Sequence, residues 1–513
     1  MPHWRSGALR NAIVAMGLTC LPVVPAGGQI NAPPEFQVIQ IAPALDRPVA
    51  MAFTGDGRMF VAQRDGVVKV IQNNAVVSTF IDLSAEVNNT VALGDRGMLA
   101  LALDPNFLSN RRVYLFYAVD PIPGQPDEGS DVATFSRLTR YTGTAASNGN
   151  VADLASRTVL IGATPAQGFA CCWRTHTTGA LRFATDGSLL VSHGESALYG
   201  VVDGGGQTPP CFDELMNPAE DVGAFRAQML DSHDGKILRI DPATGNGRAG
   251  NPFYNAGSPA SPRSRVWVSG LRNPFRFAVR PGTGSASTPG TIYVSDVGWN
   301  TYEELSVSRT GGENMGWPCY EGFANNAAYS SINLPVWDCA TINTPGNPGP
   351  LKPPLIALHH GNAMQSTPPG LIASCLIAGA FHSGDSYPSP WRGGLFMADF
   401  IGGWIEVVRT NANDQLTGIY GFGNGPGAGI VDFARDPVTG DICVLTMFDG
   451  IHRLHSLIGP GDVDRNGSVN VNDLLQIITH WGPCSNPLTC PSDLNVSGQV
   501  DVNDLLEVIT HWG

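Results

Sequence analysis

The stretch Phe183-Ala-Thr-Asp-Gly-Ser-Leu-Leu-Val-Ser192 places an Asp-Gly turn between an apolar residue and a run of apolar residues. Asp-Gly between apolar segments is typical of a tight turn that joins two antiparallel strands, so this stretch predicts a β-hairpin. The stretch Phe53-Thr-Gly-Asp-Gly-Arg-Met-Phe-Val-Ala62 has the same pattern. Looser copies of the pattern begin at Leu103, Val279, Trp391 and Phe433.

Six such hairpins before residue 460 predict an all-β six-bladed β-propeller, because radial repetition of small sheets leaves few exposed sheet edges. The 61 glycines, 39 prolines and only 14% charged residues of the chain favour many short strands and turns. Two unrelated β-sandwiches are the alternative. Because the copies are unevenly spaced, residues 119–135, 196–230 and 318–375 are expected to be long loops over one face.

The charge balance excludes some classes of partner. The net charge is −14, and Lys69, Lys236 and Lys352 are the only lysines. A nucleic-acid-binding protein needs a basic face, and so does a protein that binds an anionic membrane, so neither partner is expected. No stretch after the N-terminal segment approaches the length of a membrane-spanning helix, so no integral membrane segment is predicted.

The N-terminus has the pattern of a secretory signal peptide. Arg5 and Arg10 precede the apolar stretch 12–24, and small residues at 26–28 offer a cleavage site. We therefore expect residues 1–28 to be removed and the mature protein to be secreted, periplasmic or on the cell surface.

Export permits disulfide bonds. Cys484 and Cys490 flank a short loop and form a plausible pair. Weaker expectations pair Cys319 with Cys339, and Cys211 with Cys171 or Cys172.

A Gly-Pro-Gly linker at 459–461 separates the propeller, residues 29–458, from a small C-terminal domain, residues 459–513. Within that domain, residues 461–482 and 492–513 align without gaps and are identical at 13 of 22 positions. Each copy ends in an amphipathic run that predicts a helix whose apolar face packs on its twin. The expected fold is therefore a β-propeller followed by a small α-helical domain.

Each copy of the repeat begins with a loop that carries oxygen atoms at the spacing of a twelve-residue calcium loop, with glycine at position 6 and a backbone carbonyl at position 7. The alternative is a pair of Asx-turns without metal. The first predicted ligand set is Asp462, Asp464, Asn466, Ser468, Asn470 and Asp473. The second is Asp493, Asn495, Ser497, Gln499, Asp501 and Asp504.

The two copies resemble the duplicated repeat of type I dockerins over nearly all of 461–513, with Asp in place of Glu at the last loop position. The resemblance implies two Ca²⁺ ions and attachment to a partner, either a cohesin-like domain or a component of the cell surface. Ser497 at position 5 departs from the usual dockerin pattern.

Residues 33–457 resemble the glucose/sorbosone dehydrogenase family, which includes soluble sugar dehydrogenases that use pyrroloquinoline quinone (PQQ). The resemblance implies a six-bladed propeller that oxidises the C1 hydroxyl of a sugar. The motifs that carry it begin at Gly97 (GMLALALDPNF), His176 (HTTGALRFATDG), Gly235 (GKILRID), Gly270 (GLRNPFRFA), Asp296 (DVGWNTYEE) and Asn314 (NMGWP).

The resemblance also implies roles for individual residues. His176 stands where the family's catalytic base lies, and imidazole suits proton transfer because its pKa is near neutrality. Arg272 and Asn273 match a pair beside the cofactor, where the guanidinium would stabilise charge that grows on the quinone. Gly298 and Trp299 match positions whose carbonyls hold a calcium ion beside the cofactor.

Several residues depart from the family pattern. Asp95 replaces a glutamine, Thr175 replaces an aspartate, Ile401 stands near an expected lysine, and Gly429 and Val431 stand near two expected arginines. PQQ carries three carboxylates, and their burial requires compensating positive charge. A PQQ site would therefore need to recruit Arg276, Arg280, Arg392 or Arg453.

Two functions follow from the sequence. The first is an exported PQQ-dependent aldose or sugar dehydrogenase, tethered through its calcium-loaded C-terminal domain and with His176 and Arg272 as catalytic residues. The alternative is a non-catalytic propeller that binds a glycan or protein ligand through its loops.

Overall fold

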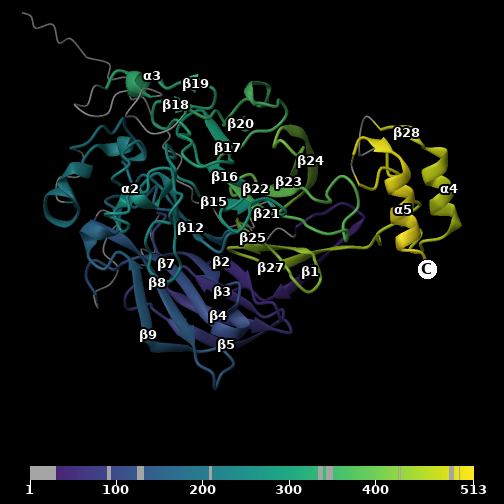
Figure 1. Cartoon of the computed structure of the whole chain (residues 1–513), viewed down its shortest axis with the longest axis horizontal. Helices are drawn as coiled ribbons and strands as arrows, with labels where there is room; N and C mark the ends of the chain where they lie inside the picture. Colours follow the sequence, from purple (N-terminus) through teal and green to yellow (C-terminus); the bar gives the residue numbers. More distant parts are fainter. Residues whose placement is uncertain are drawn as a thin grey trace, which may run out of the picture.

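The computed structural model describes residues 30–88, 94–123, 132–206, 211–332, 339–342, 350–425, 427, 429–484, 490–495 and 497–513. The predicted signal peptide, residues 1–28, lies outside the described residues. The chain forms a large β body followed by a small two-helix module at its C-terminus (Figure 1).

Six small antiparallel sheets form the blades of the β body. Blade one contains β2 (Pro48–Phe53), β3 (Met59–Gln63), β4 (Val67–Gln72) and β5 (Ala75–Asp82). Blade two contains β6 (Met98–Leu103), β7 (Arg112–Ala118) and β8 (Thr134–Gly143), and both β9 (Ala152–Ile161) and β10 (Phe169–Cys171) pair with β8. Blade three contains β11 (Leu181–Phe183), β12 (Leu189–His193), β13 (Lys236–Ile240) and β14 (Val266–Val268).

The other three blades follow in chain order. Blade four contains β15 (Arg276–Val279), β16 (Ile292–Asp296), β17 (Tyr302–Ser308) and β20 (Ile356–His359). Blade five contains β21 (Leu376–Phe381), β22 (Leu395–Asp399), β23 (Trp404–Thr410) and β24 (Leu416–Asn424). Blade six contains β25 (Ile430–Arg435), β26 (Ile442–Thr446), β27 (Gly450–Ser456) and β1 (Phe36–Ala42).

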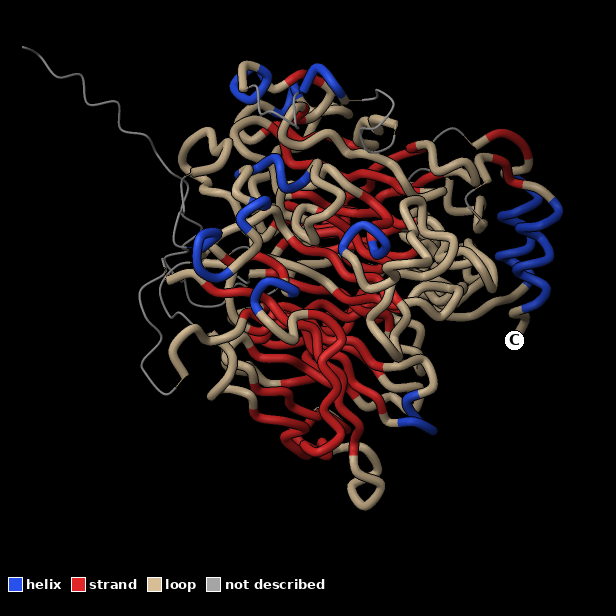
Figure 2. The backbone as a smooth tube through the Cα atoms, turned by 60° about the vertical axis from the view of Figure 1, so that its left-hand side comes forward, coloured by secondary structure: helices blue, strands red, loops and turns tan. Residues whose placement is uncertain are grey.

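The first strands of consecutive blades contact one another in a closed ring, β2–β6–β11–β15–β21–β25 and back to β2. This ring confirms the predicted six-bladed propeller. Figure 2 shows the strands concentrated in the centre of the body and the loops and short helices around it. Apolar side chains from facing sheets fill the spaces between blades, where they form the hydrophobic core.

The hairpins form where the sequence predicts them. Phe183 at the end of β11 pairs with Leu189 at the start of β12, and Phe53 pairs with Met59 in the same way. The copy at Trp391 differs, because it begins just before the second strand of its blade rather than on the first. The segment between the paired strands β21 and β22 contains Pro388 and Pro390, which cannot donate to a strand ladder, so this segment forms a loop rather than a tight hairpin turn.

Blade six is closed by the N-terminal strand. Strand β1 pairs antiparallel with β27, and Phe36 lies opposite Ser456. The first strand of the chain therefore fastens the last blade and completes the ring.

The expectation that 318–375 is only a loop was wrong. Beside β18 (Tyr320–Glu321), β19 (Ala324–Asn325) and α3 (Ala327–Ser330), the segment contains β20, the outermost strand of blade four. Four residues of β20 pair with β17, which protects the edge of the blade. The other short helices of the body are α1 (Phe107–Asn110) and α2 (Pro262–Arg265).

Three disulfides join Cys172 to Cys211, Cys319 to Cys339 and Cys484 to Cys490. All three pairs were expected, and the structure selects Cys172 over Cys171 as the partner of Cys211. Cys171 stays a buried free thiol whose sulfur lies 3.0 Å from the Ser136 hydroxyl.

The C-terminal module consists of α4 (Val471–Thr479) and α5 (Val502–Thr510), with β28 (Gly482–Pro483) paired to β29 (Gln499–Val500). Capping boxes begin both helices, with Asn470 and Asp473 on α4 and Asp501 and Asp504 on α5. Among the described residues, every helix is too short and too polar to cross a membrane.

Candidate active site

The predicted site residues converge because each precedes the innermost strand of its blade. His176 precedes β11, Arg272 and Asn273 precede β15, and Asp95 precedes β6. The Asp95 carboxylate accepts hydrogen bonds from the backbone N–H of His176 at 2.7 Å and from the Asn273 amide at 3.3 Å. Asp95, His176 and Asn273 come from three different blades, so the hydrogen bonds of Asp95 connect these blades at one end of the central channel.

His176 is held in an unusual conformation. Its backbone φ is +56°, in the left-handed region, and its side chain is only 5% exposed. The ring atom Nδ1 lies 2.9 Å from the carboxylate of the fully buried Glu195. An ionised carboxylate only accepts hydrogen bonds, so Nδ1 carries the proton and Nε2 keeps a lone pair that can accept one.

Glu195 is a functional residue that the sequence reasoning missed. It directly follows β12, and the backbone N–H of Ala197 also donates to its carboxylate. Burial would raise the pKa of Glu195, but the nearby His176 and Arg272 outweigh this effect and hold the pKa below its ordinary value. An ionised carboxylate thus orients the imidazole. The only signal in the sequence was an acidic residue just past a strand, in His193-Gly194-Glu195.

Arg272 and Asn273 are positioned through their backbone. Both N–H groups donate to the carboxylate of Asp296, at 2.8 and 2.7 Å. Burial raises the pKa of Asp296 to about 7, although these hydrogen bonds favour the ionised form. The Arg272 guanidinium lies over the Trp317 ring, 5.4 Å from its centroid.

The loop that carries Gly298 and Trp299 is also fixed. Nη1 of Arg272 donates to the Gly298 carbonyl at 2.6 Å. The Glu321 carboxylate accepts from the four backbone N–H groups of residues 299–302. A calcium ion at the Gly298 carbonyl would therefore compete with the Arg272 guanidinium for that oxygen.

Several buried polar atoms around His176 and Arg272 have no hydrogen-bond partner within the described residues. Buried groups of this kind are rare in folded proteins, and at a site they are available to a ligand. They are Nε of Arg272, Nε1 of Trp173 and Trp317, and Oγ1 of Thr175 and Thr177.

The positions of the expected cationic clamp hold neutral residues. Val431 is 1% exposed and packs in the core, and Ile401 is an exposed turn residue whose backbone N–H donates to Asp399. A Cβ atom on Gly429 would lie 2.8 Å from the Phe448 ring. A long cationic side chain at Gly429 would therefore require its aromatic neighbours to move.

The four arginines that could replace the clamp are already paired with carboxylates. Arg276 sits deep in the channel with Asp432, 3.6 Å away, and donates to the carbonyls of Gly179 and Val49, which belong to blades three and one. The other pairs are Arg280 with Asp414, Arg392 with Glu507, and Arg453 with Asp436.

The residues present fit a proton-transfer site better than a site for a triply anionic quinone. Carboxylates line the site: Asp95 and Glu195 contact His176, Asp296 accepts from the backbone of Arg272, and Glu303 pairs with His360 at 3.0 Å. None of the residues after 29 that lie outside the described ranges is Lys or Arg. Because the four candidate arginines are committed elsewhere, the expected carboxylate clamp of PQQ is not assembled among the described residues.

The structure also brings the predicted calcium ligands of the first loop together. Ligand oxygens of Asp462, Asp464 and Asp473 lie within 4.8 Å of one another. Asp462 accepts from the N–H groups of Asn466 and Gly467, and Asp473 accepts from Asn470. The amide of Asn470 in turn donates to the carbonyl of Ser468.

The second loop has the same arrangement. Asp493 accepts from the backbone N–H groups of Ser497 and Gly498, and Asp504 accepts from those of Asn495 and Asp501. The Ser497 hydroxyl donates to the carbonyl of Gln499 at 2.9 Å. The second loop therefore repeats the internal hydrogen bonds that the Asp462 and Asp473 carboxylates accept in the first loop.

Comparisons with known proteins support the propeller fold. The PQQ-bound aldose sugar dehydrogenase of Streptomyces coelicolor superposes with a TM-score of 0.52 at 18% identity, over 84% of this chain and 99% of that chain. A putative oxidoreductase (glucose dehydrogenase) of Thermus thermophilus gives a TM-score of 0.53 at 23% identity, over 82% of this chain and 99% of its own.

Curated relatives include proteins of different kinds. The uncharacterized protein slr1608 of Synechocystis is 25% identical, over 75% of this chain and 78% of its own. Aldose sugar dehydrogenase YliI of Escherichia coli is 25% identical, over 59% of this chain and 67% of its own. Human Hedgehog-interacting protein is 23% identical, over 51% of this chain and 34% of its own.

The sequence model of one family, described as Glucose / Sorbosone dehydrogenase, matches residues 45–334. This match covers more than half of the 513 residues and includes His176, Glu195, Arg272, Asn273 and the Gly298 loop. The chain therefore belongs to the Glucose / Sorbosone dehydrogenase family.

Proposed function

We propose that this protein is an exported sugar dehydrogenase in which His176 accepts the proton of the substrate hydroxyl group. The observation that carries the proposal is the pairing of His176 Nδ1 with the buried, ionised Glu195 at the end of the channel. This pairing leaves Nε2 as the proton acceptor. It also stabilises the imidazolium that forms when the proton arrives.

The other residues of the site support this role by positioning and by charge. Asp95 fixes the backbone of His176, and Asp296 fixes Arg272 and Asn273. The Arg272 guanidinium stabilises negative charge that develops beside it during the reaction. The family resemblance implies PQQ as hydride acceptor. We expect PQQ to bind more weakly than at a site with a full clamp, because each missing charged hydrogen bond costs about 1.5–3 kcal/mol.

The test is dye reduction by the full chain with PQQ, calcium and a panel of aldoses. We expect His176→Gln to lower the rate by about 100-fold or more, because a general base contributes about 100- to 10,000-fold. His455→Gln is the matched control, because His455 also pairs with a carboxylate, Asp441 at 3.0 Å, but on the outer part of blade six. Equal activity of the His176 variant and the wild type would refute the proposal.

The second candidate function is a non-catalytic propeller that binds a glycan or protein ligand. It is favoured by the committed arginines and by a relative, human Hedgehog-interacting protein, whose name describes binding. It predicts no PQQ absorbance change at any calcium concentration. A saturable PQQ spectrum that Arg272→Ala removes would exclude this alternative.

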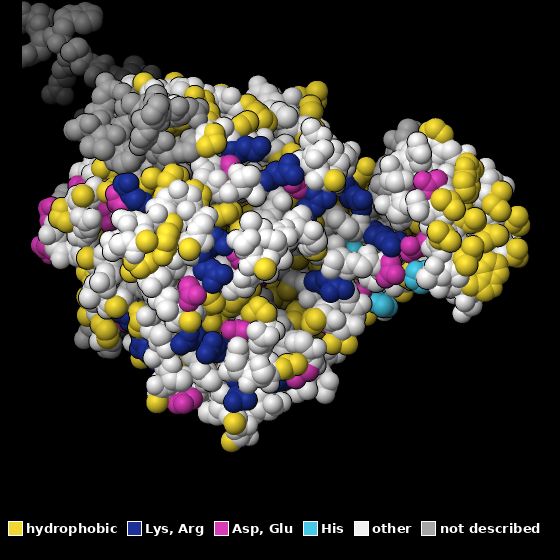
Figure 3. Space-filling model, in the orientation of Figure 1, with side chains coloured by type: hydrophobic (Ala, Val, Ile, Leu, Met, Phe, Trp, Pro, Cys, Tyr) yellow, Lys and Arg dark blue, Asp and Glu magenta, His cyan; other side chains and the backbone are white. Residues whose placement is uncertain are grey.

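We also propose that residues 459–513 form a dockerin-like module that binds two calcium ions and attaches the protein to a cohesin-like or cell-surface partner. The module is supported by the converging oxygens of Asp462, Asp464 and Asp473 in the first loop and by the matching hydrogen bonds of the second. It is also supported by two equivalent half-exposed apolar rows on its helices, which Figure 3 shows on its outer face. The rows are Val471, Leu475, Ile478 and Trp481, and Val502, Leu506, Ile509 and Trp512.

Calcium titration by calorimetry tests the module. The wild type should bind two ions in these loops, and Asp473→Ala or Asp504→Ala should each remove one, because position 12 supplies a major ligand. Full binding by the double variant would contradict the assignment. Calcium removal should also expose the module to proteases, because unneutralised carboxylates in each loop repel one another.

A further inference from the structure

The C-terminal module contacts the propeller through the start of its first loop and the end of its last helix. Arg465 of the first loop pairs with Glu35, which precedes β1. Arg392, between β21 and β22, pairs with Glu507 of α5 at 2.9 Å. The module therefore docks against blades five and six (Figure 1).

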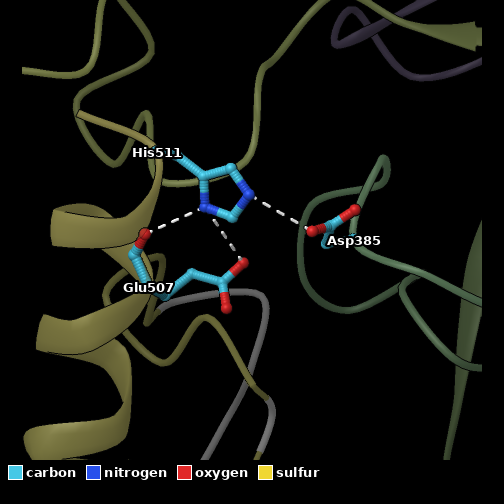
Figure 4. Close-up of side chains that lie close together, drawn as sticks. All are labelled: Asp385, Glu507 and His511. Carbon is cyan, nitrogen blue, oxygen red and sulfur yellow. Dashed lines mark hydrogen bonds and ion pairs between the residues drawn. The ribbon is translucent and has the colours of Figure 1, made fainter. Parts of the chain in front are cut away.

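A second cluster lies in this interface, where it joins two residues of the module to one of the propeller (Figure 4). Glu507 and His511 lie one turn apart at the C-terminal end of α5, and Asp385 comes from the segment between β21 and β22. All three side chains are partly buried, and one ligand atom of each lies within 4.8 Å of the others. This set contains an imidazole nitrogen and two carboxylates.

The imidazole is oriented for metal binding. Nδ1 of His511 lies 2.9 Å from the backbone carbonyl of Glu507, which can only accept, so Nδ1 carries a hydrogen. Nε2 then points its lone pair toward the Asp385 carboxylate, 3.2 Å away. A histidine whose other nitrogen donates to a carbonyl is the usual arrangement in metal sites. Two lone pairs at this distance need a proton or a metal ion between them.

The distance between two of the ligand atoms fits tetrahedral coordination of a metal ion. Metal–ligand bonds of about 2.0 Å at a tetrahedral angle place neighbouring ligand atoms about 3.3 Å apart. The distance between His511 Nε2 and Asp385 matches this edge. The Glu507 carboxylate lies beside Nδ1, 3.8 Å away, so its side chain must turn toward Nε2 to complete the site. One Glu507 oxygen pairs with Arg392, which leaves the other oxygen for the metal.

We propose that Asp385, Glu507 and His511 bind one divalent transition metal ion of the Zn²⁺ class, with water as the fourth ligand, and that this ion clamps the module to the propeller. Imidazole with carboxylates selects Zn²⁺ over Ca²⁺, which prefers six to eight oxygen ligands. The site is separate from both calcium loops, so its occupancy and theirs can be measured independently.

The internal repeat provides a built-in control. His480 of α4 is the counterpart of His511, and its Nδ1 lies 2.8 Å from the Gln476 carbonyl in the same way. Gln476 stands where α5 has Glu507, so the first copy lacks that carboxylate. His480→Ala therefore removes an equally oriented histidine without touching the proposed site.

The first test is Zn²⁺ titration of the full chain in calcium-saturated buffer by calorimetry, with Co²⁺ absorbance to report tetrahedral coordination. We expect wild type and His480→Ala to bind Zn²⁺ with the same affinity. His511→Ala and Asp385→Ala should each weaken binding by more than about 10-fold, since even outer partners of metal ligands contribute that much. Equal Zn²⁺ affinity in wild type and His511→Ala overturns the site.

A second readout separates a metal clamp from a simple ion pair. With Zn²⁺ present, limited proteolysis at the linker around residues 457–459, where Leu457 and Gly459 are exposed, should slow in wild type and in His480→Ala, but not in His511→Ala. If Zn²⁺ leaves the cleavage rate of wild type unchanged, the three side chains form an ion pair only and the proposal fails. Arg392→Ala should raise the Zn²⁺ affinity, because it frees the second oxygen of Glu507 and removes a positive neighbour.

Discussion

His176 shows how a single residue can be prepared for proton transfer by its neighbours. Its left-handed backbone is held by Asp95, and its ring is held by a carboxylate that stays ionised despite burial. Neither partner is next to it in the sequence. Asp95 of blade two therefore fixes the backbone of His176, and Glu195 of blade three determines which ring nitrogen can react.

Glu195→Gln should lower kcat by about 10- to 100-fold with little change in KM, because a neutral amide still orients the ring but no longer stabilises the imidazolium. Steady-state kinetics from pH 5 to 9 measure both kcat and KM. An unchanged kcat would show that Glu195 only supports the fold.

Asp296 gives the stability of the protein a predictable pH dependence. Burial raises its pKa from 3.8 to about 7, so between these values the folded protein holds a proton that the unfolded chain has released. The free energy of unfolding must therefore fall as the pH rises through this window, by at most about 1.4 kcal/mol per pH unit for one proton, and level off above the folded pKa.

Comparison of wild type with Asp296→Asn isolates this contribution. Denaturant unfolding at several pH values between 5 and 8 should give a steeper decline of stability in wild type than in the variant. The slopes of the free energy of unfolding against pH are compared, and not the absolute stabilities, because the substitution also changes the hydrogen bonds to Arg272 and Asn273. Parallel curves would show that Asp296 keeps an ordinary pKa.

At the level of elements, the propeller depends on one strand that closes it. Strand β1 comes from the N-terminus but pairs with β27 in blade six. Its first residue, Phe36, is buried against Tyr387, Trp391 and Phe422 in edge-to-face contacts. Aromatic side chains of blade five thus fix the strand that completes the ring.

Phe36→Ala should destabilise the protein by about 3–5 kcal/mol, because it leaves a cavity in this cluster and loosens the closing strand. Phe323→Ala is the control, because Phe323 is 51% exposed and its loss should cost little. Urea unfolding followed by tryptophan fluorescence measures both. Equal midpoints for the two variants would mean that β1 contributes little to closure.

At the level of the whole molecule, the sequence predicts those features of the fold that are encoded by short stretches of neighbouring residues. The Asp-Gly hairpins and the duplicated C-terminal repeat are encoded by neighbouring residues, so six blades and two helices could be expected in advance. Pairing of β1 with β27, the role of β20 and the choice of Cys172 over Cys171 depend on contacts between distant segments. Local patterns carry no signal for these contacts.

The same limit applies to the candidate site. Motifs place His176, Arg272 and Asn273, but Glu195 has no distinguishing motif. Whether the four candidate arginines can bind the carboxylates of PQQ depends on which other groups their guanidinium groups contact. Arg276 is engaged by Asp432 on the far side of the channel, a contact visible only in the folded chain. Ion pairs between blades therefore decide the charge available at the site.

The overall charge also makes a prediction about how PQQ reaches the site. The chain carries a net charge of −14, of which two calcium ions would neutralise only four, so a triply anionic quinone approaches against long-range repulsion. Salt screens this repulsion, because the Debye length falls from about 30 Å at 0.01 M to about 10 Å at 0.1 M. The association rate of PQQ, measured by stopped-flow absorbance in calcium buffer, should therefore increase over this range of salt. A protein with an exposed cationic clamp would show the opposite trend, so a rate that falls with added salt would reveal local positive charge that outweighs the net charge of the chain.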